Sequence, residues 1–254
     1  MRYDTEILKK LFSCIDHTSL NATDTSSSVE RFCADTREMC ERVGETVAAV
    51  CVYPPYVATA VRMLKDTRMA VASVACGFPS AQTTLDLKLQ EVRYVLEQGA
   101  DEVDMVISRG PIIDGELAKV FDEVAAVREL CIARKLKVIL ETGELQTEAN
   151  ITAAAQTAVA AGADFIKTST GKIPVGATLE AADIMLKILR NNGTISEKLV
   201  GFKASGGISS VENAMQYIDL ARLYFDDKYI DKQTFRIGAS RLTSKVYQLL
   251  CEKN

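Results

Sequence analysis

Two lysines stand late in apolar segments of the sequence. Lys167 follows Phe165-Ile166, and Lys203 follows Gly201-Phe202. Lysine is almost never fully buried without a partner, so each placement is unusual. Desolvation and a like charge nearby both lower the pKa of an ammonium group, and a lysine with a lowered pKa offers more neutral amine for attack on a carbonyl. A lysine that simply reaches solvent from a strand end is the alternative, but the repetition favours the nucleophile.

An internal repetition adds a carboxylate to this pair. Asp104 lies five residues beyond Gly99, just as Lys167 lies five residues beyond Gly162, and both glycines open a Gly-Ala-Asp turn. If the two segments are strands 4 and 6 of a barrel, alternate strands contribute to the same interior layer. We therefore expect Asp104 and Lys167 to point into the barrel near its C-terminal mouth. There Asp104 either transfers protons or holds a lysine in an ion pair, and the two roles are compatible.

A second set of polar residues ends another short segment, Asp16-His17-Thr18. Asp16 is a candidate for orienting the charged groups, and Thr18 and Thr170 are candidate supporting residues. His17 is the single histidine, and a structural role is favoured over that of a general base. With one histidine, and with Glu141 and Glu144 lacking clustered partners, no metal site is expected.

Glycines recur after three successive segments, in Gly171-Lys172, Gly206-Gly207 and Gly238-Ala239-Ser240. Barrels commonly bind phosphate in the loops after strands 7 and 8, through backbone N–H groups and helix N-termini. Turn geometry alone explains any one glycine. Their shared placement nevertheless predicts a phosphate pocket. Its expected contacts are Gly171, Lys172, Gly206, Gly207, Gly238 and Ser240.

The elements that position these residues alternate along the chain. Short apolar runs recur about every 30 residues and read as strands buried on both faces of a parallel sheet. Helical stripes separate them, such as Leu85, Leu89, Val92 and Leu96, and no linker interrupts the alternation. We expect strands at 13–17, 47–52, 69–76, 102–107, 137–141, 164–169, 199–203 and 234–238. Eight strands in 254 residues predict an α/β protein, a single-domain (β/α)8 TIM barrel over residues 1–254.

Composition excludes several classes of function. The net charge is −4, with 25% charged and 48% hydrophobic residues, so the chain is globular and has no basic surface for nucleic acid. No apolar run is long enough to span a membrane. No Gly-x-Gly-x-x-Gly or P-loop pattern is present, and no cofactor is expected. Seven cysteines without a Cys-x-x-Cys pair, behind a start that lacks a signal peptide, favour reduced thiols and a cytoplasmic location.

An activated lysine, a second lysine, a carboxylate and a phosphate pocket together indicate a class I aldolase, which cleaves or forms a C–C bond through a lysine Schiff base. The substrate would be a phosphorylated sugar or keto acid. Two alternatives remain: a Schiff-base barrel aldolase for a different phosphorylated sugar, and a catalytically silent barrel that binds a phosphorylated metabolite. The composition is compatible with a homo-oligomer, and we expect a dimer or a tetramer.

The same motifs resemble the deoxyribose-phosphate aldolase family over nearly the whole chain. The most specific are Phe-Ile-Lys-Thr-Ser-Thr-Gly-Lys, which ends at Lys172, and Gly-Phe-Lys…Gly-Gly, which ends at Gly207. One departure is Arg241, which stands where small residues are common. A cation there is expected to tighten phosphate binding.

The resemblance implies that Lys167 forms the Schiff base, that Lys203 lowers its pKa, and that Asp104 moves protons with an ordered water. It implies reversible cleavage of 2-deoxy-D-ribose 5-phosphate to acetaldehyde and D-glyceraldehyde 3-phosphate, in the catabolism of deoxyribonucleotides. Lys172, Gly206, Gly207 and Ser240 resemble the phosphate contacts of the family.

Overall fold

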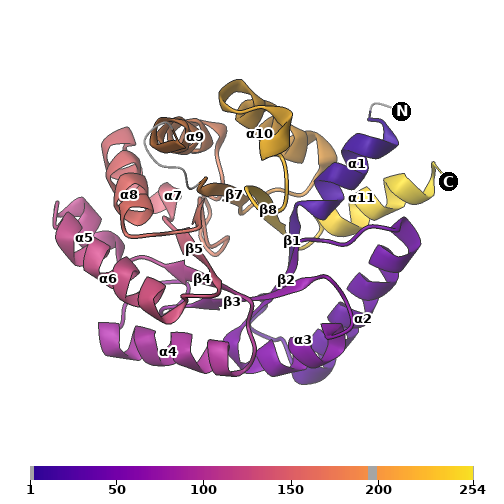
Figure 1. Ribbon diagram of the computed structural model, residues 1–254, viewed down its shortest axis with the longest axis horizontal. Coiled ribbons are helices and arrows are strands. Elements are labelled where there is room, and N and C mark those ends of the chain that lie inside the picture. The colour runs from indigo at the N-terminus through magenta and orange to yellow at the C-terminus, as the bar shows by residue number, and fades with distance from the viewer. Residues whose placement is uncertain (1–2, 194–198, 254) are drawn as a thin grey trace.

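Eight parallel strands close into a barrel, and helices surround it (Figure 1). The computed structural model describes residues 3–193 and 199–253. Each strand pairs with the next, and β8 returns to β1 with Ile15 opposite Ile237. The strands are β1 (Ile15–Thr18), β2 (Ala49–Val52), β3 (Ala70–Ala75), β4 (Glu102–Val106), β5 (Lys135–Ile139), β6 (Phe165–Lys167), β7 (Gly201–Ser205) and β8 (Phe235–Ala239). The predicted (β/α)8 TIM barrel is therefore confirmed.

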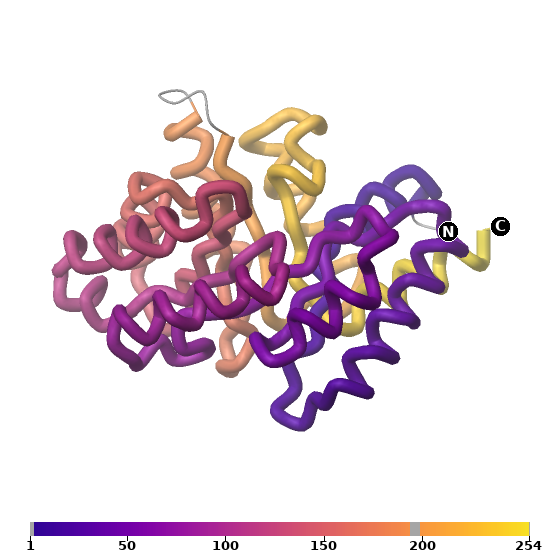
Figure 2. The backbone as a smooth tube through the Cα atoms, turned by 60° about the horizontal axis from the view of Figure 1, so that its bottom comes forward, coloured from indigo at the N-terminus to yellow at the C-terminus, as the bar shows by residue number. Residues whose placement is uncertain are grey.

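Helices join consecutive strands, and α1 and α11 pack side by side, which brings the two ends of the described chain together (Figure 2). The α-helices are α1 (Thr5–Ser13), α2 (Ser26–Val43), α3 (Val57–Leu64), α4 (Leu85–Glu97), α5 (Arg109–Ile113), α6 (Leu117–Leu130), α7 (Thr142–Leu145), α8 (Glu148–Ala160), α9 (Leu179–Gly193), α10 (Val211–Tyr224) and α11 (Leu242–Cys251). Two short 3-10 helices are η1 (Pro54–Tyr56) and η2 (Asp227–Tyr229).

Strand positions match the expectation to within two residues at each end. The segment expected at 164–169 contributes only three residues to the barrel, Phe165–Lys167, and polar loop residues follow. Side chains alternate along each strand: in β7, Lys203 faces the interior, whereas Phe202 packs outward against Phe235. All eight strands run in the same direction, so the side chains at their carboxyl ends meet at one mouth.

One member of a predicted helical stripe lies outside the buried face. Val92 is buried and Leu89 and Leu96 pack against the core as expected, but Leu85 is 39% exposed. The buried face of α4 carries Lys88 instead, whose Nζ lies 2.8 Å from Glu123 Oε2 and 2.6 Å from Ser108 Oγ. Hydrophobic periodicity cannot anticipate a lysine that is buried by pairing with a partner on another helix.

Candidate active site

The barrel interior brings Lys167, Lys203 and Asp104 into direct contact. Lys167 Nζ lies 2.8 Å from Asp104 Oδ2, and Lys203 Nζ lies 2.7 Å from the same oxygen. All three side chains are at least 96% buried. The expectation that Asp104 and Lys167 point into the barrel at similar height is therefore confirmed.

A larger buried network lies around this cluster. Lys137 Nζ is 2.7 Å from Asp16 Oδ2, 2.6 Å from Glu102 Oε2 and 3.0 Å from Asp104 Oδ1. Lys203 also contacts Asp16 at 2.5 Å, so Asp16 joins the two lysines as expected. Arg236 extends the network, with ion pairs to Asp16 and to Glu102.

The charges of this network do not balance when every group is ionised. Three carboxylates, Asp16, Glu102 and Asp104, face four cations, Lys137, Lys167, Lys203 and Arg236. A buried charge without a counter-ion is costly, and an amine avoids this cost by losing its proton. Lys167 contacts only one of the three carboxylates, so the loss of its proton breaks the fewest ion pairs.

Electrostatic shifts follow from these contacts. Burial lowers the pKa of Lys167 below its ordinary value; Asp104 opposes the shift, and Lys203 adds to it. Burial acts on Lys203 in the same direction, but Asp104 and Asp16 outweigh it and raise the pKa of Lys203. Three carboxylates raise the pKa of Lys137 well above its ordinary value against the same desolvation. The site therefore contains one activated amine beside two lysines that stay charged.

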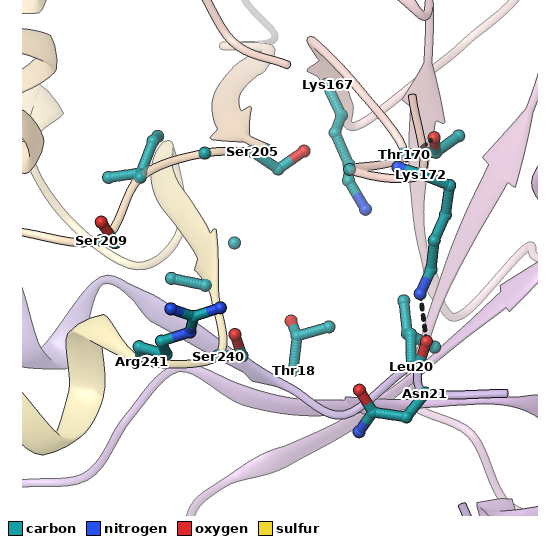
Figure 3. A pocket seen from close by; sticks show the side chains of 16 residues that line it. Thr18, Leu20, Asn21, Lys167, Thr170, Lys172, Ser205, Ser209, Ser240 and Arg241 are labelled. Carbon is teal, nitrogen blue, oxygen red and sulfur yellow. Dashed lines mark hydrogen bonds between the residues drawn. The ribbon is translucent and has the colours of Figure 1, made fainter. Parts of the chain in front are cut away.

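A pocket of about 380 Å³ opens above Lys167 at the C-terminal mouth (Figure 3). Its lining contains Thr18, Thr170 and every residue predicted to contact phosphate: Gly171, Lys172, Gly206, Gly207, Gly238 and Ser240. Among the described residues, the pocket lining includes the basic side chains of Lys167, Lys172 and Arg241 and no Asp or Glu. Such a site attracts an anion.

Backbone geometry adds donors to these charges. The N–H groups of Gly171, Gly206 and Gly207 donate to no acceptor in the described chain. Gly206 has φ +91°, and a Cβ there would lie 2.9 Å from Gly176 Cα and 3.3 Å from Gly171 Cα, so only glycine allows these loops to meet. Successive free N–H groups in such turns form concave anion sites.

The remaining predicted residues lie nearby in other roles. Thr18 donates its hydroxyl to the Asp16 carbonyl at 2.9 Å. The Thr170 hydroxyl contacts Glu141, whose burial raises its pKa. His17 faces outward from β1, with Nδ1 2.9 Å from Thr36 Oγ1, and burial lowers its pKa to about 4. These contacts agree with a structural role for His17.

The thiols of Cys51 and Cys76, which lie in and directly after barrel strands, are buried. Burial raises the pKa of Cys51 to about 11 and that of Cys76 well above its ordinary value. A thiol of this kind is a poor nucleophile, because the reactive form is the thiolate. In residues 3–193 and 199–253, no three His, Cys, Asp or Glu side chains gather as metal ligands.

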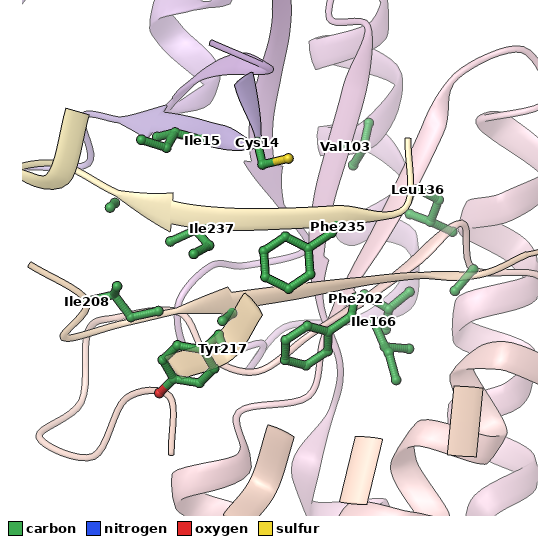
Figure 4. Close-up of a cluster of buried hydrophobic side chains, with 14 of the residues drawn as sticks. Cys14, Ile15, Val103, Leu136, Ile166, Phe202, Ile208, Tyr217, Phe235 and Ile237 are labelled. Carbon is green, nitrogen blue, oxygen red and sulfur yellow. The ribbon is translucent and has the colours of Figure 1, made fainter. Parts of the chain in front are cut away.

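Sequence reasoning missed Lys137, Glu102 and Arg236. Arg236, like Lys167, is a charged residue inside an apolar strand. Its neighbours Phe235 and Ile237 pack with Phe202 in the apolar layer outside the strands (Figure 4). Glu102 stands two residues before Asp104 and so lies on the same face of the strand. The expected strand 137–141 begins at Lys137, and a lysine at the start of a strand is explained by exposure to solvent.

Fold and site together define a barrel enzyme with an activated lysine beneath an anion pocket. The model of the DeoC/LacD family aldolases matches residues 10–222. Deoxyribose-phosphate aldolases of Bos taurus and Homo sapiens are each 40% identical over 252 residues, which cover 94% of this chain and 79% of theirs. A crystal structure of a putative deoxyribose-phosphate aldolase from Coccidioides immitis has a TM-score of 0.81 and 30% identity, and covers 97% of this chain and 86% of that one.

The chain belongs to the DeoC/LacD family of aldolases, and it is an enzyme of the lyase class. The recognition of the deoxyribose-phosphate aldolase family from the sequence is thereby confirmed. A structure from Aeropyrum pernix, described as a unique tetrameric deoxyribose phosphate aldolase, also matches, with 26% identity, a TM-score of 0.76 and coverage of 97% and 93% of the two chains. None of the helices in the described residues has the length and apolar character needed to cross a bilayer.

Proposed function

We propose that this enzyme cleaves 2-deoxy-D-ribose 5-phosphate reversibly to acetaldehyde and D-glyceraldehyde 3-phosphate through a Schiff base on Lys167. The lowered pKa of Lys167, at the floor of a pocket that contains cations and no carboxylates, is the observation that supports this function most strongly. The names of the curated relatives support the choice of substrate.

The proposed reaction begins when the neutral amine of Lys167 adds to the aldehyde carbon of the open-chain sugar. Loss of water gives an iminium ion, which accepts electrons. Asp104 takes the proton of the C3 hydroxyl, the C2–C3 bond breaks, and its electron pair moves to the iminium nitrogen as an enamine. D-Glyceraldehyde 3-phosphate leaves, and protonation at C2 followed by hydrolysis releases acetaldehyde and restores the amine.

Asp104 is suited to this proton transfer. Its Oδ2 holds both lysines, whereas its buried Oδ1 makes no hydrogen bond in the described chain, although Lys137 Nζ is 3.0 Å away. We propose that this oxygen, which pairs with Lys137 alone among the lysines of the network, accepts the hydroxyl proton directly or through water. The carboxylate must stay ionised to serve as a base: desolvation raises its pKa, but Lys137, Lys167 and Lys203 outweigh it and hold the pKa of Asp104 well below its ordinary range.

The phosphate is proposed to bind at the glycine-rich wall of the pocket. The N–H groups of Gly171, Gly206 and Gly207 have no protein acceptor in the described residues, and Gly238 and Ser240 complete that wall. Lys172 and Arg241 supply positive charge from opposite sides (Figure 3). Charge-assisted hydrogen bonds of this kind are shorter and stronger than neutral ones.

Borohydride trapping tests the function. Acetaldehyde or 2-deoxyribose 5-phosphate is added with borohydride, and the adduct is located by peptide mapping, while glyceraldehyde 3-phosphate release is followed by a coupled assay. The expected result is turnover and a single adduct on Lys167. An adduct at another residue contradicts the mechanism. Trapping of acetaldehyde without turnover identifies an aldolase for a different phosphorylated sugar, and neither adduct nor turnover identifies a silent binding barrel.

The organisation around this reaction is also proposed. We infer a single-domain enzyme that needs no cofactor and works in the cytoplasm, supported by six buried thiols without disulfides. We further propose a homo-oligomer, supported by the tetrameric relative and by the exposed side chains Leu87, Ile113 and Phe121. Light scattering behind size exclusion checks the assembly; a monomer at micromolar concentration contradicts it.

A further inference from the structure

Glu141 combines a strained backbone conformation with the burial of a carboxylate. It follows β5 with φ +58° and ψ +60°, the left-handed region that residues other than glycine rarely adopt, and its side chain is fully buried. Such strain persists only where surrounding contacts fix the residue, and it gathers at functional positions. Both of its carboxylate oxygens contact one residue, Thr170: Oε1 accepts the backbone N–H at 3.1 Å, and Oε2 accepts the hydroxyl at 2.5 Å.

Thr170 transmits this contact to the proposed phosphate site. Because its hydroxyl proton is donated to Glu141, a lone pair faces the other way and accepts the N–H of Lys172 at 3.1 Å. The turn between these residues contains Gly171, whose own N–H has no acceptor in the described residues and lies at the pocket wall. Glu141 itself does not line the pocket.

The loop that follows Thr170 is held at further points on both sides. A Cβ at Gly143, in α7, would lie 2.4 Å from the Val175 carbonyl, and a Cβ at Gly176 would lie 2.4 Å from the Gly206 carbonyl. The loop is therefore wedged between α7 and the Gly206-Gly207 turn, which also lines the pocket. Within this packed arrangement, the Glu141 carboxylate sets the hydrogen-bond directions.

We propose that Glu141 is a positioning residue that sets the affinity of the pocket for the substrate's phosphate group by orienting Thr170 and the Gly171-Lys172 backbone. The inference rests on the proposed phosphate site. Because Glu141 reaches neither the pocket nor Lys167, its loss weakens the binding of phosphate in the ground state and in the transition state equally. Such a change raises KM and leaves kcat nearly unchanged.

The test compares Glu141→Gln with a matched control, Glu144→Gln. Glutamine keeps the size of the side chain but offers an NH2 group where Oε2 accepted, so the Thr170 hydroxyl turns away from its present orientation. Glu144 lies on the same short helix and pairs with Arg109 without touching Thr170. The affinity for inorganic phosphate is measured by calorimetry, and KM and kcat are measured with 2-deoxyribose 5-phosphate and with unphosphorylated 2-deoxyribose.

Glu141→Gln is expected to weaken phosphate binding and to raise KM for the phosphorylated sugar, each by roughly tenfold or about 1.4 kcal/mol. We expect kcat, and kcat/KM for 2-deoxyribose, to stay within about threefold of wild type. Glu144→Gln should match wild type in every measurement. Phosphate affinity within about twofold of wild type, or an equal loss with both sugars, overturns the proposal.

If Glu141→Gln fails to fold, two variants of Thr170 test whether the hydroxyl that Glu141 orients sets the phosphate affinity. Thr170→Ser keeps the hydroxyl and should keep the phosphate affinity, whereas Thr170→Val should lose it; equal affinities overturn the proposal. Phosphate binding needs no turnover, so this test is separable from that of the reaction. If Glu141→Gln weakens phosphate binding but the wild type turns over no deoxyribose phosphate, the positioning role of Glu141 holds and the proposed function fails.

Discussion

Two regions of the barrel interior differ sharply in chemistry. Strands β2 and β3 present small apolar side chains, Ala49, Cys51, Ala72 and Val74, which pack together with Leu20. The other six strands carry the charged network, from Asp16 in β1 to Arg236 in β8. Both regions are buried, so burial alone does not decide which lysine loses its proton. That outcome depends on how many carboxylates each ammonium contacts.

Lys167 is the lysine whose desolvation outweighs its ion pairing. Burial lowers its pKa, and only one carboxylate, that of Asp104, opposes the shift through an ion pair. Lys137 and Lys203 contact three and two carboxylates and stay charged. The comparison teaches that an activated amine can form inside a cluster of ion pairs when the cluster has one cation more than it has carboxylates.

Lys167→Met should have the largest effect on activity and little effect on stability. We expect kcat to fall by roughly a thousandfold or more, since no other side chain supplies the amine. Replacing the unbalanced cation leaves three carboxylates facing three cations, so the free energy of unfolding should stay within about 1 kcal/mol of wild type or rise. Coupled assays and urea unfolding provide the two measurements. A large loss of stability contradicts the charge count.

Lys137→Met should behave in the opposite way. It breaks buried ion pairs to all three carboxylates, whereas Lys167→Met breaks one, and it should cost about 3–5 kcal/mol of unfolding free energy. Lys135→Met is the matched control on the same strand, because Lys135 contacts Gln233 near the surface. Thermal and urea unfolding compare the variants. Similar stability for both would refute the role assigned to Lys137.

These two lysines also mark how far the sequence could predict the site. Lys167 was predictable because an apolar strand and a repeated turn frame it, and the same reasoning found Asp104 and Lys203. Lys137 opens its apolar run in the sequence, and only barrel closure brings it to Asp16 from across the interior. Glu141 depends on a left-handed backbone and on a loop from the next strand, and neither feature has a signal in a single sequence.

His17 tests whether a buried basic group that lacks a carboxylate partner loses its proton readily. It lies on the outer face of β1, and its hydrogen-bond partners in the described chain are Thr36 and the Ser240 carbonyl. Its pKa falls from 6.5 to about 4. Between these values the unfolded chain binds the proton and the folded chain does not, so stability rises with pH and is lost as pH falls towards 4. We expect this histidine to account for up to about 3 kcal/mol of the loss between pH 7 and pH 4.

The measurement is urea unfolding of wild type and His17→Gln across that range. Carboxylates contribute to both proteins, so the difference between the two slopes isolates His17, the single histidine of the chain. The variant should lose less stability on acidification than wild type. Parallel slopes would show that His17 titrates normally.

Lys203→Leu should have the smallest effect, a change in the free energy of proton loss from Lys167. Removing a positive charge beside Lys167, and leaving Asp104 less compensated, both raise the pKa of Lys167. The pH midpoint for trapping acetaldehyde with borohydride should move upward by about one unit, or about 1.4 kcal/mol. Lys135→Met serves again as the control and should leave the midpoint in place. A downward or absent shift means that Lys203 does not tune the amine.

Direct titration of the lysines by NMR, with 13C and 15N labels at Cε and Nζ, tests the central claim most directly. We expect Lys167 to titrate below 10.5, the ordinary lysine value, and Lys137 and Lys203 to titrate above it. The Lys167→Met and Lys203→Leu variants assign the signals. If Lys167 titrates at or above 10.5, or if Lys203 loses its proton first, the charge-balance explanation of the nucleophile is wrong.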